Sequence, residues 1–451
     1  MCLLINSYSY NGFPFCSEMG CICTCTKCRS KGDISFSTSN RRLSIKIVPE
    51  SQYSIMGCNA SILENYASNT TITYGADTIH DSVYQEKSIG EPLIVRANSL
   101  IHEPTPIINA SVTAREIVLR RCGQTEPLSF EECYTPQTLQ KCFKIGEGVY
   151  GEVFLFKNHN GTSSVMKIIP IEGKQMVNGE HQKKFEEVLS EIVIAMELSN
   201  LRNETKNKTY GFSEVQKIRC VQGRYPERLL ELWDIYDETH HSENESPEMF
   251  TDDQLYIIFE FANAGTDMEA FVFNNALQAF ALFKQTACSL AIAESALQFE
   301  HRDLHWGNIL ISQTDKNKKL TYCLDGHELT IPACGIVVTV IDFTLSRITH
   351  DGVCIYNDLS MDPDLFTATG DYQFEIYKLM QKHNNNEWQH FQPYSNVLWL
   401  HYVVDKMTSA LRYKNTNSNV HKNAIKTLLQ LKDRILQYNS AEDLVKNEFL
   451  L

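Results

Sequence analysis

The segment His301-Arg302-Asp303-Leu304-His305-Trp306-Gly307-Asn308 constrains this chain more than any other part of its sequence. It places an aspartate, Asp303, five residues before an asparagine, Asn308. At this spacing the carboxylate can accept the proton of a substrate hydroxyl, while the asparagine holds a magnesium ion on the phosphates of ATP. The segment therefore predicts a phosphoryl-transfer site in which Asp303 is the catalytic base and Asn308 is a metal ligand.

A glycine-rich stretch nearer the N-terminus supplies a second part of such a site. The run Gly146-Glu147-Gly148-Val149-Tyr150-Gly151-Glu152-Val153 has the spacing G-x-G-x-x-G-x-V. Glycines let the backbone approach phosphate oxygens, and the valine can cover an adenine ring. A dinucleotide-binding turn uses similar glycines but opens a helix, whereas the strand-like run 152–156 follows here. The predicted ATP contacts in this stretch are Gly146, Glu147, Gly148, Val149, Tyr150, Gly151 and Val153.

A lysine and a glutamate further along the chain complete the expected grip on the phosphates. Lys167 lies within the strand-like run 165–169 and is expected to hold the α- and β-phosphates as a catalytic residue. Its carboxylate partner should come from the helix predicted over 185–201, where Glu191 lies mid-helix between apolar residues. Three other glutamates of this helix remain alternatives and are more typical of solvated helix charges: Glu186, Glu187 and Glu197.

The apolar run 255–261 is predicted to be the strand that leads into the hinge between two lobes. The backbone groups of Phe259, Glu260 and Phe261 are expected to bind the adenine edge of ATP, with Phe259 as the bulky residue behind the nucleotide. An ordinary strand end without any ligand remains the alternative for these three residues.

A second apolar run, 338–341, is predicted to deliver Asp342 to the metal ion as the second magnesium ligand. Thr344 stands where metal loops of this kind have a glycine. Because a β-branched side chain restricts the backbone, we expect this loop to be less mobile than one that contains glycine.

These motifs occur in the order and at the spacing of protein kinases, with strands first and long helices afterwards. The sequence therefore predicts an α+β, bilobal protein-kinase-like fold with a small β-rich N-lobe and a larger helical C-lobe. The kinase domain is expected over 125–451, with the N-lobe over about 125–261 and the C-lobe over about 262–451. Residues 1–120 are rich in Ser, Thr and Asn and are expected to be a mostly disordered extension. Long helices are predicted over 276–299, 372–382 and 423–438.

The segment that follows Asp342 distinguishes this chain from most protein kinases. An Ala-Pro-Glu sequence is missing there, and the chain instead contains Asp358-Leu359-Ser360-Met361-Asp362-Pro363-Asp364-Leu365-Phe366. Together with Asp342-Phe343-Thr344, the segment 301–308 and the stretch 128–133, this segment resembles the haspin family of atypical eukaryotic serine/threonine kinases. The resemblance covers roughly residues 125–451.

The resemblance implies an ATP- and magnesium-dependent serine/threonine kinase that phosphorylates the threonine at the third position of the histone H3 N-terminal tail during mitosis. It implies a location in the nucleus, on chromosomes, and activity without phosphorylation of the segment after Asp342. It also implies that acidic residues grip the basic tail and that His305 positions the substrate hydroxyl. By motif match, the substrate contacts would be Asp358, Asp362, Asp364, Asp267 and Glu269.

The charge distribution is compatible with a basic partner. The chain has a formal net charge of -14, and residues 1–120 contain 10 basic and 10 acidic side chains, so all of the excess lies beyond them. An acidic surface disfavours direct nucleic-acid binding and favours a basic partner. A soluble acidic enzyme with no such partner would explain the charge equally well. We expect a monomer.

The cysteines and the apolar runs indicate in which cellular compartment the protein is expected. The chain has 15 cysteines, and most of those beyond position 120 are scattered singly, as free thiols are in a reducing intracellular compartment. Cys25-Thr26-Lys27-Cys28, within a cysteine cluster over 16–28, could supply half of a zinc site, but a second pair is missing. The sequence has no run of 18 apolar residues and a poor signal peptide, so no membrane segment is expected.

Two other functions remain open. The chain could be a catalytically silent pseudokinase module that binds basic tails, or an active kinase with a different basic protein substrate. The presence of Lys167, Asp303 and Asp342 favours an active enzyme. Nucleotide binding would not separate the first alternative from an active kinase, whereas phosphate transfer would.

Overall fold

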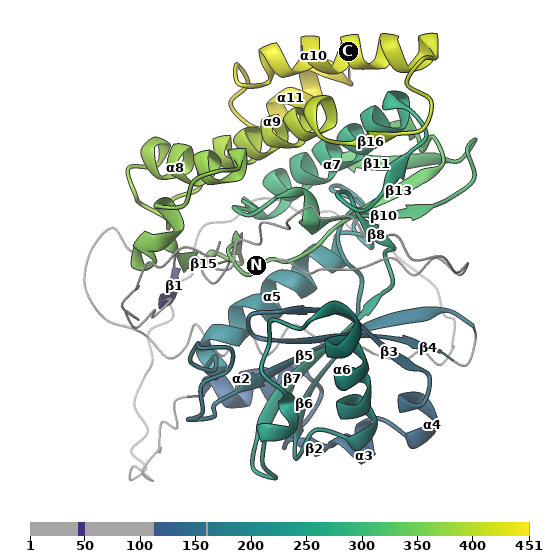
Figure 1. Ribbon diagram of the computed structural model, residues 1–451. Helices are drawn as coiled ribbons and strands as arrows, with labels where there is room; N and C mark the ends of the chain where they lie inside the picture. Colours follow the sequence, from purple (N-terminus) through teal and green to yellow (C-terminus); the bar gives the residue numbers. More distant parts are fainter. Residues whose placement is uncertain (1–43, 50–111, 159–160, 451) are drawn as a thin grey trace, which may run out of the picture.

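The computed structural model describes residues 44–49, 112–158 and 161–450, and these form two lobes (Figure 1). The N-lobe is built on a six-stranded sheet with the order β2-β6-β7-β5-β4-β3. Its neighbouring strands are antiparallel except for β2 and β6, which are parallel. The strands are β2 (Leu128–Ser129), β3 (Cys142–Gly148), β4 (Gly151–Lys157), β5 (Ser163–Ile171), β6 (Val215–Gln222) and β7 (Leu255–Ala262).

Helix α5 (Phe185–Asn200) lies between this sheet and the C-lobe (Figure 1). Its apolar residues recur at helical spacing, and Val188, Ile192 and Ala195 are buried, so the helix packs by one broad apolar face. Helix α2 (Ala114–Arg121) packs on α5 and β6, and α6 (Glu227–His240) packs on β3. The remaining helical turns of this lobe are α3 (Phe130–Cys133), α4 (Pro136–Leu139) and η1 (Pro247–Met249).

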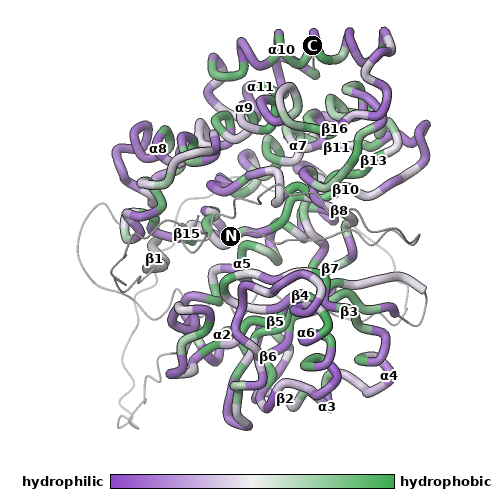
Figure 2. The backbone as a smooth tube through the Cα atoms, viewed as in Figure 1, coloured by the Kyte–Doolittle hydropathy of each residue, from purple (hydrophilic) through white to green (hydrophobic). Residues whose placement is uncertain are grey.

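The C-lobe is organised around one long helix, α7 (Ala276–Leu297), which packs against three other helices of the lobe. Figure 2 shows hydrophobic stretches at the centre of each lobe and hydrophilic ones at its periphery. Among the described residues, α7 alone is long and apolar enough to cross a membrane, but 78% of its most apolar window is buried inside the fold, as in a core helix. The other helices are α8 (Tyr372–His383), α9 (Tyr394–Ser409), α10 (Asn419–Ile435) and α11 (Ala441–Glu448).

Short sheets position the functional segments of the C-lobe. Strand β10 (Ile309–Gln313) pairs with β8 (Thr266–Asp267) and β13 (Ile336–Val340). A second sheet has the order β1-β15-β14, in which β1 (Ser44–Pro49) pairs with β15. The remaining elements are β9 (Val272–Phe273), β11 (Lys319–Leu324), β12 (His327–Pro332), β14 (Arg347–His350), β15 (Val353–Asp358), β16 (Arg412–Tyr413), η2 (Trp306–Asn308), η3 (Leu359–Met361) and η4 (Pro363–Phe366).

The predicted α+β fold with a β-rich N-lobe and a helical C-lobe is confirmed. The helices predicted over 185–201, 276–299 and 372–382 agree with α5, α7 and α8 within two residues at each end. The helix predicted over 423–438 begins earlier, at Asn419, because the Ser418 side chain accepts a hydrogen bond from the His421 N–H and caps α10.

Part of the sequence prediction lies outside the described residues. This is true of the cysteine cluster over 16–28 and of most of the extension expected over 1–120. Helix α2 begins at Ala114, within the expected extension, and the domain boundary near 120–125 stays a prediction. Each cysteine in the described part of the chain is a free thiol.

Candidate active site

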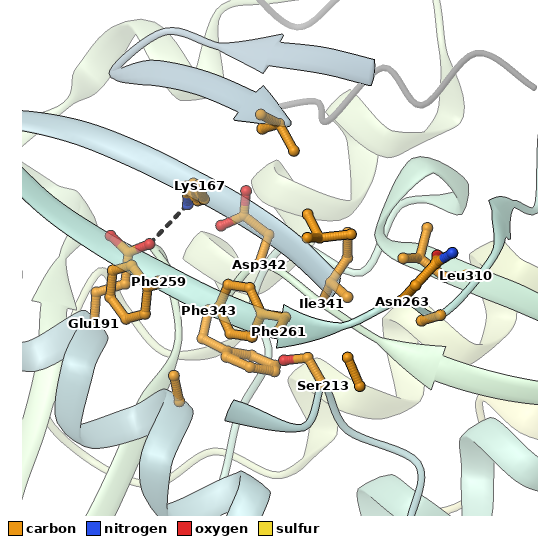
Figure 3. A pocket seen from close by; sticks show the side chains of 15 residues that line it. Lys167, Glu191, Ser213, Phe259, Phe261, Asn263, Leu310, Ile341, Asp342 and Phe343 are labelled. Atoms are coloured by element: carbon orange, nitrogen blue, oxygen red, sulfur yellow. Dashed lines mark hydrogen bonds and ion pairs between the residues drawn. The ribbon is translucent and has the colours of Figure 1, made fainter. Parts of the chain in front are cut away.

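A pocket of about 640 Å³, open to solvent, lies between the two lobes (Figure 3). Two N-lobe valines, Val153 and Val165, and two C-lobe residues, Leu310 and Ile341, give it apolar walls. Figure 3 shows Lys167, Glu191 and Asp342 grouped at one end of the pocket, away from Asn263. Apolar walls with charged groups at one end suit a ligand that combines a flat ring with a charged tail, as a nucleotide does.

Strand register explains why residues far apart in the sequence share this pocket. Val153 on β4 pairs with Lys167 on β5, and Lys167 pairs with Phe259 on β7. Side chains of directly paired residues point to the same face of a sheet, so these three form one row. Glu260 points to the opposite face, where its Oε1 accepts from Arg219 Nε at 2.9 Å. Any contact of Glu260 with adenine would therefore go through its backbone.

Lys167 pairs with Glu191, one of four candidate glutamates on α5. The distance from Lys167 Nζ to Glu191 Oε1 is 2.8 Å, and the two side chains are 9% and 8% exposed. Burial lowers the pKa of Lys167, but the carboxylates of Glu191 and Asp342 outweigh it and raise the pKa above its ordinary value. The lysine therefore stays charged, as a phosphate-binding cation must.

The three alternative glutamates of α5 have other surroundings. Glu186 is exposed, and Glu187 accepts a hydrogen bond from the Lys184 N–H at the start of the helix. Glu197 lies 3.9 Å from Arg121 of α2 and 3.7 Å from His350 of β14. Within α5, the charge that faces Lys167 is thus that of Glu191.

The loop 301–308 brings Asp303 and Asn308 together. Asn308 Nδ2 donates to the Asp303 carbonyl oxygen at 2.8 Å, and this bond fixes the direction of the amide. The Ile341 N–H donates to the Asn308 carbonyl oxygen at 3.0 Å, which brings Asp342 next to this loop. His305 is buried, and its Nδ1 accepts from the Gly307 N–H at 3.1 Å, so the ring shapes the turn before Asn308.

The oxygens of Asn308 and Asp342 fit a magnesium ion. Asn308 Oδ1 is buried and accepts no hydrogen bond from the part of the chain that the structure describes. Burial raises the pKa of Asp342, but the Lys167 ammonium and hydrogen bonds from Thr344 outweigh it and lower the pKa well below its usual value. An ionised carboxylate and an amide oxygen are ligands that Mg²⁺ accepts, and an unsatisfied buried oxygen calls for a partner.

Side chains from outside the glycine-rich loop hold its backbone. Asn244 Nδ2 donates to the Gly148 carbonyl oxygen at 3.1 Å, and Asn178 Nδ2 donates to the Val149 carbonyl oxygen at 2.8 Å. The Glu147 side chain accepts from Lys144, Ser242 and the Glu243 N–H. The loop is therefore fixed from its outer side, and its predicted ATP contacts at Glu147 and Val149 would be made by the backbone or by the Val149 side chain.

The five predicted substrate carboxylates fall into two groups. Asp267 and Asp358 are buried, and each accepts a hydrogen bond from a backbone N–H two or three residues later, as carboxylates that cap turns do. Asp362 and Asp364 are partly exposed, and Glu269 is exposed. The second group is accessible to a peptide, whereas the first shapes the backbone on which it stands.

Tyr377, which is not among the residues predicted from the sequence, contacts the proposed base directly. This tyrosine lies on α8, is buried, and donates its hydroxyl to Asp303 Oδ1. The hydrogen bond holds one carboxylate oxygen in a fixed direction. No motif marks Tyr377, because its contact with Asp303 joins residues 74 positions apart.

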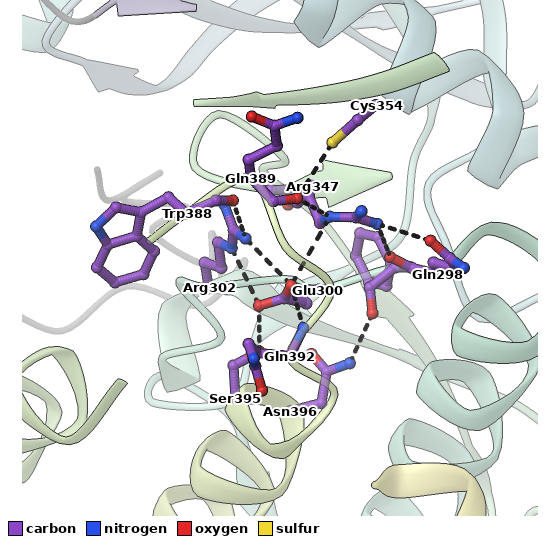
Figure 4. A network of polar contacts seen from close by, with 12 residues as sticks. Gln298, Glu300, Arg302, Arg347, Cys354, Trp388, Gln389, Gln392, Ser395 and Asn396 are labelled. Carbon is purple, nitrogen blue, oxygen red and sulfur yellow. Dashed lines mark hydrogen bonds and ion pairs between the residues drawn. The ribbon is translucent and has the colours of Figure 1, made fainter. Parts of the chain in front are cut away.

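Arg302 belongs to a buried polar network rather than to the pocket (Figure 4). Its Nε and Nη2 donate to Glu300 at 3.2 and 3.1 Å, and Nη2 also donates to the Trp388 carbonyl oxygen at 2.7 Å. Ser395 Oγ donates to the same glutamate at 2.9 Å. The guanidinium thus joins the loop 301–308 to the segment that precedes α9.

Two lobes with a Lys167–Glu191 pair above a loop that carries Asp303 and Asn308 define a protein-kinase-like domain. Residues 40–448 match a family model described as haspin like kinase domain. The chain is 46% identical over 333 residues to serine/threonine-protein kinase haspin of Mus musculus, covering 73% of this chain and 44% of that protein. It is 43% identical over 333 residues to the Drosophila melanogaster haspin homolog, covering 72% of this chain and 58% of that protein.

A haspin homolog of Schizosaccharomyces pombe is 30% identical over 397 residues, covering 82% of this chain and 76% of that protein. The chain therefore belongs to the haspin-like kinase domain family. The matched region spans about half the length of the first two relatives named above.

We expect acid to destabilise the fold through His301. Its Nδ1 accepts from the Asp303 N–H at 3.3 Å, so Nε2 carries the proton and donates to the Ile341 carbonyl oxygen at 3.1 Å. Burial lowers the pKa of His301 from 6.5 to about 4. Between these pH values the His301 ring binds a proton in the unfolded chain but stays neutral in the folded chain. The free energy of unfolding should therefore fall as pH drops from 6.5 towards 4.

Urea unfolding at several pH values between roughly 7.5 and 4.5, the range in which a histidine titrates, would measure this fall in the free energy of unfolding. The variant His301→Gln lacks the titrating ring, so its free energy of unfolding should depend less steeply on pH over the same range. Equal slopes for the wild type and the variant would contradict the role given to His301.

We also expect the two asparagine contacts to support ATP binding. Asn178→Ala and Asn244→Ala each free a carbonyl of the glycine-rich loop, so each should weaken ATP binding by roughly 3- to 10-fold, the equivalent of one hydrogen bond. Titration with a fluorescent ATP analogue measures this. Asn317→Ala, a change in a C-lobe turn, serves as the control and should bind ATP as the wild type does. Unchanged affinity for the ATP analogue in both loop variants would contradict the role given to the two asparagines.

Proposed function

We propose that this chain is an ATP- and magnesium-dependent serine/threonine kinase that phosphorylates the threonine at the third position of the histone H3 N-terminal tail. The observation that carries the catalytic part is the buried Lys167–Glu191 pair, which lies at the same end of the pocket as Asp342. Relatives named serine/threonine-protein kinase haspin support the same reaction class. We further propose that it acts as a monomer on chromosomes in the nucleus, during mitosis.

Each residue then has a defined part in phosphate transfer. Asp303 takes the proton of the substrate hydroxyl as its oxygen bonds to the γ-phosphorus, while the bond from that phosphorus to the bridging oxygen of ADP breaks. Tyr377 holds Asp303 in the required direction. Lys167 binds the α- and β-phosphates, and Asn308 and Asp342 would hold Mg²⁺, which when bound neutralises charge on the transferring phosphate.

The accessible carboxylates support a basic peptide substrate. The turn that carries Glu269 is joined to the loop 301–308, because the Met268 N–H donates to the Trp306 carbonyl oxygen at 3.3 Å. Asp362 and Asp364 lie on or beside η4, which packs on α8, the helix that carries Tyr377. Carboxylates on these two segments would attract a basic tail and its free amino terminus. The histone tail itself is proposed from the family resemblance.

Transfer of radiolabelled phosphate from ATP to a histone H3 N-terminal peptide tests the proposal. The wild type should label the peptide, and Asp303→Asn should lower the rate by at least roughly 100-fold because the base is lost. Peptides with alanine at the third position or an acetylated amino terminus should take up little label. Asp362→Asn with Asp364→Asn should raise the KM for the peptide and leave the affinity for ATP unchanged.

The other outcomes separate the alternatives. Transfer to other basic proteins that depends on Asp303, without transfer to this peptide, would keep the kinase and reject the histone substrate. Binding of ATP without transfer to any protein would reject catalysis and favour a pseudokinase module.

Arg302 gives a reason to propose activity without phosphorylation of the activation segment, defined here as residues 342–371. In kinases switched by phosphorylation, the new phosphate pairs with arginine side chains. Here Arg302 is fully buried, and its Nε and Nη2 donate to the Glu300 carboxylate and the Trp388 carbonyl oxygen (Figure 4). The guanidinium therefore already has the anionic partner that a phosphate would provide.

Treatment of the purified chain with phosphatase should leave the rate of peptide phosphorylation unchanged within about twofold, since no phosphate is needed to fix this segment. Mass spectrometry of the treated sample confirms that phosphate has been removed. A rate that collapses after treatment and returns after incubation with ATP would overturn the prediction.

A further inference from the structure

Glu191 binds a second lysine that the mechanism above does not use. Its Oε1 faces Lys167, and its Oε2 lies 2.7 Å from Nζ of Lys183. The side chains of Lys183 and Glu191 are each 8% exposed. One buried carboxylate is therefore shared by two buried ammonium groups, one on each oxygen.

The backbone of Lys183 is fixed where β5 ends and α5 begins. Its carbonyl oxygen accepts from the Glu172 N–H at 3.0 Å, and it forms an isolated parallel bridge with Ile171, the last residue of β5. The next residue, Lys184, is the N-cap of α5. The ammonium of Lys183 thus reaches Glu191 from a point tied to both the sheet and the helix.

Lys183 also contacts the glycine-rich loop. Its Nζ lies 4.8 Å from the centroid of the Tyr150 ring, at a distance where a cation is attracted to an aromatic face. Tyr150 stands between Val149 and Gly151, in the part of the loop expected to cover the phosphates. The same ammonium thereby joins the loop over the phosphates to the carboxylate that holds Lys167.

This arrangement matters when a nucleotide enters. Lys167 must then share its charge between Glu191 and the α- and β-phosphates. A carboxylate held by Lys167 alone would lose part of its only buried partner at that moment, and an uncompensated buried charge is strongly unfavourable. With Lys183 on the second oxygen, Glu191 keeps a full ion pair whether or not a nucleotide is bound.

We propose that Lys183 is a positioning residue for phosphate transfer: it holds Glu191 in place independently of the nucleotide and holds the glycine-rich loop closed through Tyr150. The inference rests on the proposed kinase function. Lys183 acts through Glu191, Lys167 and Tyr150, and it touches neither the transferred phosphate nor the substrate hydroxyl.

The test compares Lys183→Met, Lys183→Arg and Lys184→Met in the full chain. Lys184 is the matched control, because it is the adjacent lysine and its side chain is 51% exposed. Lys183→Met should lower kcat and weaken binding of a fluorescent ATP analogue, each by roughly 10-fold or more, because a small misplacement of Lys167 is costly for transfer. Lys183→Arg keeps the charge and should recover much of both, and Lys184→Met should match the wild type.

A double-mutant cycle distinguishes positioning from a general loss of stability. Tyr150→Leu should weaken analogue binding in the wild type but have much less effect in Lys183→Met, because the contact between the two is then already lost. Thermal unfolding identifies variants that fail to fold. Additive effects of Tyr150→Leu and Lys183→Met on analogue binding would overturn the proposal. So would wild-type kcat and affinity in Lys183→Met, or a folded Lys183→Arg that recovers neither kcat nor affinity.

The measurement of analogue binding does not depend on phosphate transfer. A wild type that binds the analogue and transfers no phosphate would reject the proposed function. Weakened binding in Lys183→Met and recovery in Lys183→Arg would still support the positioning role in that case.

Discussion

The buried carboxylate of Glu191 is the interaction on which the rest of this site depends. It ties β5, through Lys167, to α5, and α5 in turn contacts β15 of the activation segment. Removing one partner of a buried ion pair typically destabilises a protein by about 3–5 kcal/mol, because the other charge is left without compensation. Any movement of α5 away from the sheet would incur this penalty, so the helix position and the ion pair are coupled.

Side chains around the site also hold its two loops, the glycine-rich loop and the loop 301–308. In many enzymes a loop closes over the ligand only when the ligand binds. Here Asn178 and Asn244 hold two carbonyls of the glycine-rich loop, and Arg302 joins the loop 301–308 to the backbone at Trp388. Each of these contacts joins residues of this chain to one another, so together they restrict how far the two loops can move.

The sequence predicted the parts of this site that chemistry confines to particular residue types and spacings. Asp303 and Asn308 must lie on one short loop, and the glycine-rich stretch must precede a strand with a lysine, so a pattern could identify them. Lys183 and Tyr377 carry no such signature, because their partners Glu191 and Asp303 are brought to them only by the packing of the fold. Spacing also cannot tell a carboxylate that binds substrate from one that caps a turn. Asp267 illustrates this, since it is buried and bonded to a backbone N–H, whereas Glu269, two residues on, is exposed.

The threonine in place of the metal-loop glycine illustrates how backbone conformation decides such a substitution. Glycine is favoured where φ is positive, and in this loop the positive φ, +61°, falls on Asp342 and not on Thr344. Thr344 therefore fits without strain, and its N–H donates to Asp342 Oδ1 at 3.2 Å. The intervening Phe343 is buried, with ring centroids of Phe212 and His301 6.0 and 5.9 Å away. Packing of this ring holds Asp342 in a conformation that costs an aspartate of order 1–3 kcal/mol, so the loop has one favoured position, and that position directs the carboxylate into the pocket beside Lys167.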